Sequence, residues 1–308
     1  MNWHKMDEYK RISMMEPPKT YPAPCVLDTD TYNEIDDQFC LSWALLDSDI
    51  DLKAIYAAPY HNDRSSGPGD GMEKSYKEIF KLLEFAGINM DGKVFRGSKQ
   101  FMPQENTVVE SESARHLVEI SKDYNWQNPL YVLAIGCPAN VSSAILIDPS
   151  IIERIVVVWL GGQPHNWAHA NEFNLMQDVY SSRVLFDSGV PMIQLPCLQV
   201  TDHLTMTIPE LEYFSKRFSK LGKYLCDCTI DYINERYDDT FCVSKVVWDI
   251  VAVSWLVNPD SVTTVLTSSP VLNMNKTYSF DRSRHQIREG ITLDRDAVFK
   301  RLFLLLKA

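Results

Sequence analysis

Two stretches of the chain are apolar at nearly every position, LYVLAI at residues 130–135 and IVVVWL at 155–160. Such runs are typical of central strands in a parallel sheet that is covered on both faces. Further β-rich runs lie at 24–28, 52–56 and 192–195. Helical patterns fall between the runs, at 37–47, 72–86, 112–124, 139–147 and 178–188. This alternation predicts an α/β fold with a mostly parallel open sheet and helices on both faces.

The two ends of the chain depart from this alternation. Residues 209–237 have a helical pattern without strands, and another helix is predicted over 244–257. Residues 1–23 are polar and rich in proline toward their end, so we expect an N-terminal extension or a partner-contacting arm. No change in composition marks a boundary after it. We therefore predict one domain over residues 24–308, with extra helices toward the C-terminus.

The composition restricts the possible partners. The chain has 308 residues, is 45% hydrophobic and carries a net charge of -11. An acidic chain without basic clusters argues against binding to nucleic acid or anionic membranes. The seven cysteines lie mostly in apolar runs, as expected in a reducing compartment. No run is long enough to span a bilayer, and no apolar signal core opens the chain, so we expect a cytoplasmic protein.

Four aspartates crowd one predicted strand-to-helix turn: Asp28, Asp30, Asp36 and Asp37. The helix macrodipole stabilises carboxylates in the first turn of a helix, which accounts for one or two of them. Like charges this close repel unless protons or a cation are shared among them. The turn therefore predicts a hard-cation site at the carboxyl end of a strand, and oxygen ligands favour Ca²⁺ or Mg²⁺ over zinc.

Polar residues also follow the other predicted strands. They are His61-Asn62, the turn GCPAN at 136–140 and the long loop 161–174. Ligands of such sheets bind at the carboxyl ends of the strands, so we expect these segments to converge. Asp249 lies inside the apolar run VVWDIVAVSWLV. Because burying an unpaired carboxylate is costly, Asp249 is a further candidate metal ligand.

Taken in order, these motifs resemble those of the nucleoside hydrolase family, the inosine/uridine-preferring nucleoside N-ribohydrolases. The resemblance covers roughly residues 24–305 and rests on Asp28-Thr29-Asp30 with Asp36-Asp37, Asn62, GCPAN, Gly161-Gly162 before Glu172-Phe173-Asn174, and Trp248-Asp249-Ile250-Val251-Ala252. It implies a Rossmann-like nucleoside hydrolase fold and a homodimer or homotetramer. It also implies Ca²⁺-dependent hydrolysis of a ribonucleoside to base and ribose, as in purine or pyrimidine salvage.

The resemblance assigns roles to individual positions. Ca²⁺ would be held by Asp30, Asp37, Asp249 and the backbone carbonyl of Ala139, and Asp30 would also accept a proton from water. The ribose contacts would fall on Asp36, Asn62, Asn166, Glu172 and Asn174. An ordinary structural role remains open for several of them, since an asparagine after a strand commonly forms a turn.

The chain departs from the family pattern at two places. The turn at 31–35 is two residues longer than usual, which moves Asn33 or Glu34 toward the pocket. Trp248 stands where many members have a histidine that helps to protonate the departing base, and an indole N–H has no useful acidity. We expect Trp248 to face the base end of the pocket, with core packing as the alternative. His165 and His169 are candidate replacements for the acid.

Two other functions stay open from the sequence. A non-catalytic ribose- or nucleoside-binding protein would keep the pocket without an effective acid. A haloacid-dehalogenase-like phosphatase would use a DxDx(T/V) motif, which DTDTY resembles except for Tyr32. Nothing in the sequence identifies the preferred base.

Overall fold

The computed structural model describes residues 3–307. Its strands are β1 (Ala23–Thr29), β2 (Ile50–Ala57), β3 (Val94–Arg96), β4 (Leu130–Ala134), β5 (Ile155–Leu160), β6 (Met192–Leu195), β7 (Thr205–Thr207), β8 (Ser244–Val246), β9 (Val262–Ser268), β10 (Val271–Leu272), β11 (Tyr278–Ser279) and β12 (Gln286–Leu293). Its helices are α1 (Glu8–Met14), α2 (Asp36–Leu46), α3 (Pro68–Ala86), α4 (Glu112–Ser121), α5 (Ala139–Ile147), α6 (Phe173–Gln177), α7 (Val179–Asp187), α8 (Ile208–Ser215), α9 (Lys220–Arg236), α10 (Ile250–Val257) and α11 (Arg295–Leu306).

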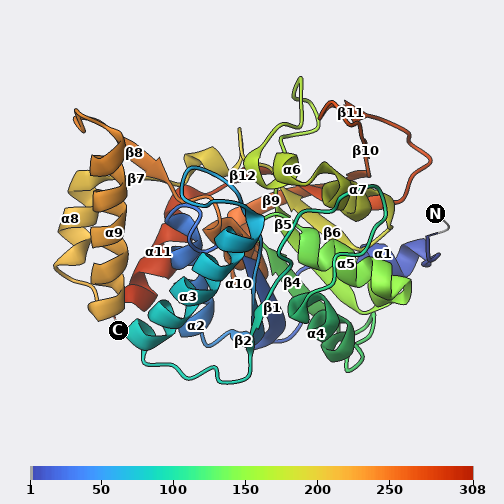
Figure 1. Ribbon diagram of the computed structural model, residues 1–308, viewed down its shortest axis with the longest axis horizontal. Helices are drawn as coiled ribbons and strands as arrows, with labels where there is room; N and C mark the ends of the chain where they lie inside the picture. The colour runs from blue at the N-terminus through green and yellow to red at the C-terminus, as the bar shows by residue number, and fades with distance from the viewer. Residues whose placement is uncertain (1–2, 308) are drawn as a thin grey trace.

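The central sheet has eight strands in the order β3-β2-β1-β4-β5-β6-β12-β9. All neighbouring pairs are parallel except β12 and β9, which are antiparallel. Helices α2, α3, α10 and α11 pack together on one side of the sheet, and α4, α5 and α7 lie on the other (Figure 1). The predicted mostly parallel α/β fold is confirmed.

The strand order reverses between β1 and β4. From β1 the chain continues outward to β2 and β3, then crosses back to β4 and builds the other half of the sheet. Loops that leave such neighbouring strands in opposite directions open a crevice at their carboxyl ends, where ligands bind in doubly wound folds. The topology therefore favours a site next to Thr29 and Ala134, the last residues of β1 and β4.

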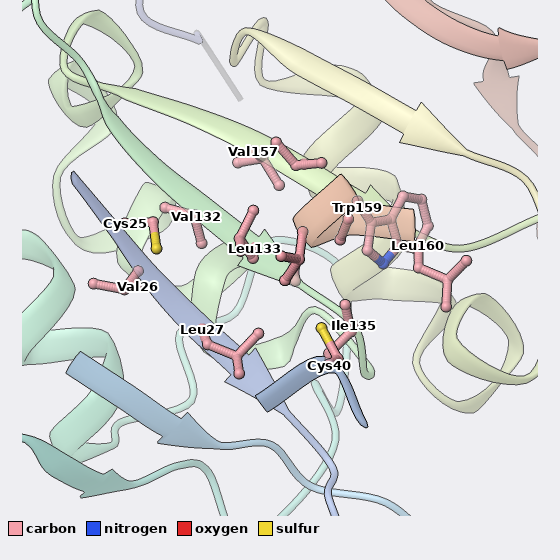
Figure 2. Packing of buried hydrophobic residues seen from close by; sticks show 14 of the residues in the cluster. Cys25, Val26, Leu27, Cys40, Val132, Leu133, Ile135, Val157, Trp159 and Leu160 are labelled. Atoms are coloured by element: carbon pink, nitrogen blue, oxygen red, sulfur yellow. The ribbon is translucent and has the colours of Figure 1, made fainter. Parts of the chain in front are cut away.

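The centre of the sheet is apolar on both faces, as the sequence predicts. Every residue of β4 and β5 is buried. Leu27 of β1 lies beside Leu133 of β4, which in turn pairs with Val158 of β5. Figure 2 shows side chains of these three strands packed together with Cys40 of α2. This core holds the strand ends in fixed positions.

The C-terminal part differs from the prediction. The helix expected over 244–257 begins only at Ile250, because residues 244–246 form β8 and pair with β7. Four strands described beyond residue 260 were also missed, and two of them, β12 and β9, extend the central sheet: β12 pairs with β6 and β9 closes that edge. Half-buried positions in both give no continuous apolar run, so their sequence signal is weak.

The N-terminal segment contains a helix, α1, which packs on the body of the protein. The Arg11 guanidinium is buried and its Nε donates a hydrogen bond to the Gly189 carbonyl at 2.8 Å. Met14 and Met15 are buried in the main core. Residues 1 and 2 of the predicted extension lie outside the described residues. Between residues 3 and 307, no helix is long and apolar enough to cross a membrane.

Candidate active site

A cavity of about 280 Å³ opens at the carboxyl ends of β1 and β4. It is lined by residues from six segments of the chain: Asp30, Asn33, Glu34, Asp36, Asp37, Ile135, Leu160, Gln163, Glu172, Phe173, Asn174, Cys197, Leu198, Trp248 and Asp249. The strand-end rule thus places the cavity correctly, because segments far apart in sequence meet where the strand order reverses.

Three carboxylates converge at one end of the cavity. Oxygens of Asp36, Asp37 and Asp249 all lie within 4.8 Å of one another. Asp36 and Asp37 form the first turn of α2, and Asp249 is the N-cap of α10, which packs against α2. The partial positive charges of two helix N-termini therefore act on this group. That effect alone does not neutralise three buried carboxylates.

A fourth carboxylate, that of Asp30, lies in the same cavity and accepts no hydrogen bond from the described residues. Its side chain is 1% exposed, and neither carboxylate oxygen has a hydrogen-bond partner within residues 3–307. Burial and the nearby charges of Asp37 and Asp36 raise the pKa of Asp30 well above its usual value. An unpaired buried charge costs several kcal/mol in general. A bound cation would remove that cost.

Burial and neighbouring charges also raise the pKa values of Asp37 and Asp249. Burial and then the charge of Asp36 raise the pKa of Asp37 to about 7, although Thr29 Oγ1 donates a hydrogen bond to it. Burial and the charge of Asp36 also raise the pKa of Asp249. The candidate metal ligands are all carboxylate oxygens, the ligand type that Ca²⁺ and Mg²⁺ prefer. The residues present therefore fit a hard divalent cation.

Asp36 and Asp30 differ in how many of their carboxylate oxygens remain free to bind a metal ion. The Trp248 backbone N–H donates to Asp36 Oδ2 at 3.1 Å, so that oxygen already has a partner. Asp30 has both oxygens free of such bonds. Asp28, in contrast, accepts a hydrogen bond from Asn140 Nδ2 at 2.8 Å and does not line the cavity.

Glu172 and Asn174 lie in the cavity wall, each with a defined local role. Glu172 is the N-cap of α6 and accepts hydrogen bonds from the N–H groups of Gly162, Asn174 and Leu175 at 2.8, 2.9 and 3.1 Å. Asn174 Nδ2 donates to the carbonyls of Ile135, which follows β4, and of Leu160, which ends β5, each at 3.1 Å. Both side chains are thus held rigidly at the strand ends.

The glycine that precedes this wall is required by its conformation. Gly162 has φ 73°, in the left-handed region, and an added Cβ would lie 2.5 Å from the Tyr278 hydroxyl. Its N–H is one of the three donors to Glu172.

Three residues that the resemblance assigns to the site do not line the cavity. Asn62 donates to Asn33 Oδ1 at 2.6 Å and to the Asn33 carbonyl at 3.3 Å, so it braces a cavity residue. Asn166 is exposed in a turn closed by the Trp167 N–H and the Pro164 carbonyl at 2.9 Å. Ala139 is buried at the start of α5. For these three, the direct contact that the resemblance implies stays a prediction.

The lengthened turn does reach the cavity. Asn33 and Glu34 both line it, and the Glu34 carboxylate forms an ion pair with Lys245 of β8. Although burial opposes ionisation, the charge of Lys245 lowers the pKa of Glu34. Arg64 Nη1 donates to the Glu34 carbonyl at 3.0 Å, and its guanidinium lies 4.3 Å from the centre of the Tyr32 ring. The turn is therefore braced from two sides.

Trp248 lines the cavity, as expected, but by a different geometry. Trp248 precedes α10, whereas the sequence prediction placed it one step along the same helix as Asp249. Its side chain also packs against the core, so the two roles weighed from the sequence coexist.

Neither loop histidine lines the cavity. His165 Nε2 lies 2.9 Å from Gln194 Oε1, and its Nδ1 lies 3.3 Å from Glu289 Oε2. Burial lowers the pKa of His165. His169 is exposed on the loop. The cavity, as formed by residues 3–307, is lined by no histidine.

Six other lining residues were not predicted as site residues from the sequence: Ile135, Leu160, Gln163, Phe173, Cys197 and Leu198. Cys197 and Leu198 lie just after β6, so the strand-end rule would have found them. Gln163 and Phe173 lie within the loop and motif already marked, but neither type signals a site by itself. Lys245 had no signal, because its segment was predicted to be helical.

Comparisons with known proteins identify the family and fold that this chain resembles. Residues 25–300 match the family described as inosine-uridine preferring nucleoside hydrolase. The pyrimidine-specific ribonucleoside hydrolase RihA of Salmonella typhimurium is 24% identical over 274 residues, which cover 79% of this chain and 82% of the relative.

Two solved structures share the fold. A purine-preferring ribonucleoside hydrolase from Gardnerella vaginalis superposes with a TM-score of 0.74 at 20% identity, over 92% of this chain and 99% of that one. The plant nucleoside hydrolase PpNRh1 superposes with a TM-score of 0.71 at 19% identity, over 93% and 99%.

Proposed function

Because the chain belongs to the inosine-uridine preferring nucleoside hydrolase family and is thus a glycosidase that acts on ribonucleosides, we propose that it does so at the acidic cavity with a bound Ca²⁺. One observation carries the proposal. Asp30 has two buried oxygens without partners beside three converging carboxylates, at the strand ends where a ligand would bind. Membership of this family argues against the phosphatase alternative.

Asp30, Asp37 and Asp249 would hold the cation. When bound, Ca²⁺ supplies positive charge that favours ionisation of a water molecule and binds sugar hydroxyls. Asp36 has one oxygen committed to the Trp248 N–H, which leaves the other for a sugar hydroxyl or the cation. Ala139 is not among the residues that line the cavity, and its backbone carbonyl stays a further proposed ligand by resemblance.

Asp30 is the proposed general base. It lies in the cavity, and both of its oxygens lack protein donors within residues 3–307. A base must reach the proton that it accepts, and free carboxylate oxygens facing the substrate meet that condition. Asp30 would take the proton from the water that attacks C1′ of the ribose.

Asp36, Glu172 and Asn174 would bind the ribose. Cleavage of an N-ribosyl bond passes through a state with oxocarbenium character, which nearby carboxylates stabilise. Three backbone N–H donors orient the Glu172 carboxylate before substrate arrives. Asn62 would act indirectly through Asn33, and Asn166 has no contact with the cavity in this conformation. By resemblance we also propose a homodimer or homotetramer, which light scattering would measure.

The test is ribose release from a panel that includes inosine and uridine. Protein freed of metal with EDTA should release no ribose, and added Ca²⁺ should restore release. Asp30→Asn should reduce kcat by a factor on the order of a thousand or more while preserving the fold. If the restored protein binds nucleosides tightly but releases ribose from none of them, the non-catalytic binding function replaces this proposal.

A further inference from the structure

We propose that the cavity selects ribonucleosides whose base carries a positive charge, such as an N-ribosyl pyridinium or an N7-alkylated purine ribonucleoside. This inference rests on the proposed hydrolase function and narrows its substrate class. Three features of the cavity support it: its charge, its aromatic side chains and, within residues 3–307, a lining without histidine.

The cavity is lined by acidic side chains and by no basic one from residues 3–307. Six carboxylates line it: Asp30, Glu34, Asp36, Asp37, Glu172 and Asp249. Lys245 lies behind Glu34 and is paired with it. With the cation bound and all six carboxylates ionised, the divalent cation and Lys245 together would offset three of the six negative charges. The remaining negative potential favours a cationic ligand and disfavours a phosphorylated one.

The wall of the cavity includes a large aromatic face. Trp248 and Phe173 both line it. The Trp248 backbone N–H donates a hydrogen bond of 3.1 Å to Asp36, which holds the Trp248 main chain next to the acidic cluster. Indole is the aromatic side chain that attracts cations most strongly. A flat cationic ring would gain more from this wall than a neutral ring of the same size.

The leaving-group chemistry points the same way. When a neutral base departs, the electron pair of the C1′–N bond stays on the base, which then needs a proton. Neither His165 nor His169 lines the cavity, and the Trp248 indole has no useful acidity. Glu34 is held as a carboxylate by Lys245 and is no proton donor.

A cationic base removes this requirement. As the C1′–N bond breaks, its electron pair moves to the ring nitrogen and cancels the positive charge, so the base departs neutral. Water forms the new bond to C1′ and releases one proton to Asp30 and then to solvent. The products are a neutral base, ribose and one proton, and no acid is needed at the base.

The experiment compares matched substrates that differ in charge. Guanosine and 7-methylguanosine form one pair, and nicotinamide riboside serves as a second cation, with kcat/KM measured in Ca²⁺ for the full chain. The kcat/KM values for the two cationic nucleosides should exceed that for guanosine by about a hundredfold or more. Discrimination of this size is reached when only the favoured substrate pairs with the polar groups of a site. Part of any such preference comes from the weaker glycosidic bond of the cations, so variants must separate the two causes.

Trp248→His provides that separation. It restores a proton donor, so kcat for guanosine should rise, whereas kcat for 7-methylguanosine should not. A second measurement avoids catalysis: N-methylnicotinamide, a cation without ribose, should inhibit competitively, and neutral nicotinamide should not. Trp248→Leu should weaken that inhibition on the order of tenfold, as loss of a cation–π contact predicts.

The failures are distinguishable. If guanosine or inosine is hydrolysed as well as the cations, and N-methylnicotinamide inhibits no better than nicotinamide, charge selection is wrong and the hydrolase function stands. If folded, Ca²⁺-loaded protein releases ribose from no nucleoside, neutral or cationic, both the selectivity and the proposed function are overturned.

Discussion

Lys245 of β8 forms an ion pair with Glu34 in the turn between β1 and α2. The two residues are 211 positions apart, and Lys245 Nζ also donates to the Val246 carbonyl at 2.8 Å. The pair joins the strand that leads to Trp248 and Asp249 with the turn that leads to Asp36 and Asp37. It therefore ties together the two halves of the acidic cluster.

Lys245→Met should destabilise the protein by about 1–3 kcal/mol. Loss of one partner from a buried pair costs more than this, but the Glu34 side chain is 35% exposed and solvent would screen its charge. Unfolding in urea would give the value. The double variant with Glu34→Gln should lose less than the sum of the two single variants, because no unpaired charge remains. Additive losses would show that the two residues do not interact energetically.

Asp37→Asn should abolish the increase in melting temperature that Ca²⁺ produces. A neutral amide at this position removes charge from the cluster without changing its size. Asp28→Asn is the matched control, because Asp28 is equally buried two residues before Asp30 but does not line the cavity. Its Ca²⁺ response should persist. Equal loss in both variants would place the cation elsewhere or show a general effect on the fold.

Ca²⁺ should stabilise the protein more at about pH 8 than at about pH 5. Without metal, the folded-state pKa of Asp37 is about 7, against an ordinary value of 3.8. A raised folded-state pKa means that this group favours folding most below pH 3.8 and loses that contribution as the pH rises through about 7. A cation takes the place of the proton, so its benefit grows over the same interval.

Melting temperatures with Ca²⁺ and with EDTA at both pH values would measure this difference. Burial lowers the pKa of His285 to about 3, which weakens the fold in acid, but that effect is present with and without Ca²⁺ and cancels. A Ca²⁺-induced shift that is larger at the lower pH would contradict a carboxylate site.

Deoxyribonucleosides should be hydrolysed on the order of a hundredfold less efficiently than ribonucleosides. Glu172 and Asn174 are held in the cavity wall by backbone hydrogen bonds. If they bind ribose hydroxyls, a missing hydroxyl leaves buried polar groups unpaired. Comparison of kcat/KM for uridine and deoxyuridine tests this, and equal values would remove these two residues from the sugar site.

His169→Ala should leave kcat and its pH dependence unchanged, since this side chain is exposed and away from the cavity. His165→Ala should lower the melting temperature, because it removes the imidazole contacts of Gln194 Oε1 and Glu289 Oε2 in a buried setting. It should not shift the pH profile of kcat. A lost acidic or basic limb of that profile in either variant would identify a histidine that reaches the substrate after loop movement.

Local pattern determined much of this fold. The runs at 130–135 and 155–160 are apolar at nearly every position because they lie in a sheet covered on both faces, so the parallel core could be predicted from them. The aspartates at 28–37 also allowed a cation site to be predicted, because carboxylates so close in sequence repel one another unless a proton or cation is shared among them. Strand ends then indicated which loops would meet.

Only the tertiary structure decided which polar groups lie free in the cavity. Asp28 and Asp30 look alike in the sequence, yet Asn140, more than a hundred residues away, donates a hydrogen bond to one Asp28 oxygen, whereas neither Asp30 oxygen has a partner within residues 3–307. Likewise Asn62 binds Asn33, and Lys245 reaches Glu34 from a strand that the sequence suggested was helix. The type of a residue sets which hydrogen bonds it can form. Which of these it does form depends on neighbours that are distant in sequence, and local sequence periodicity does not reveal them.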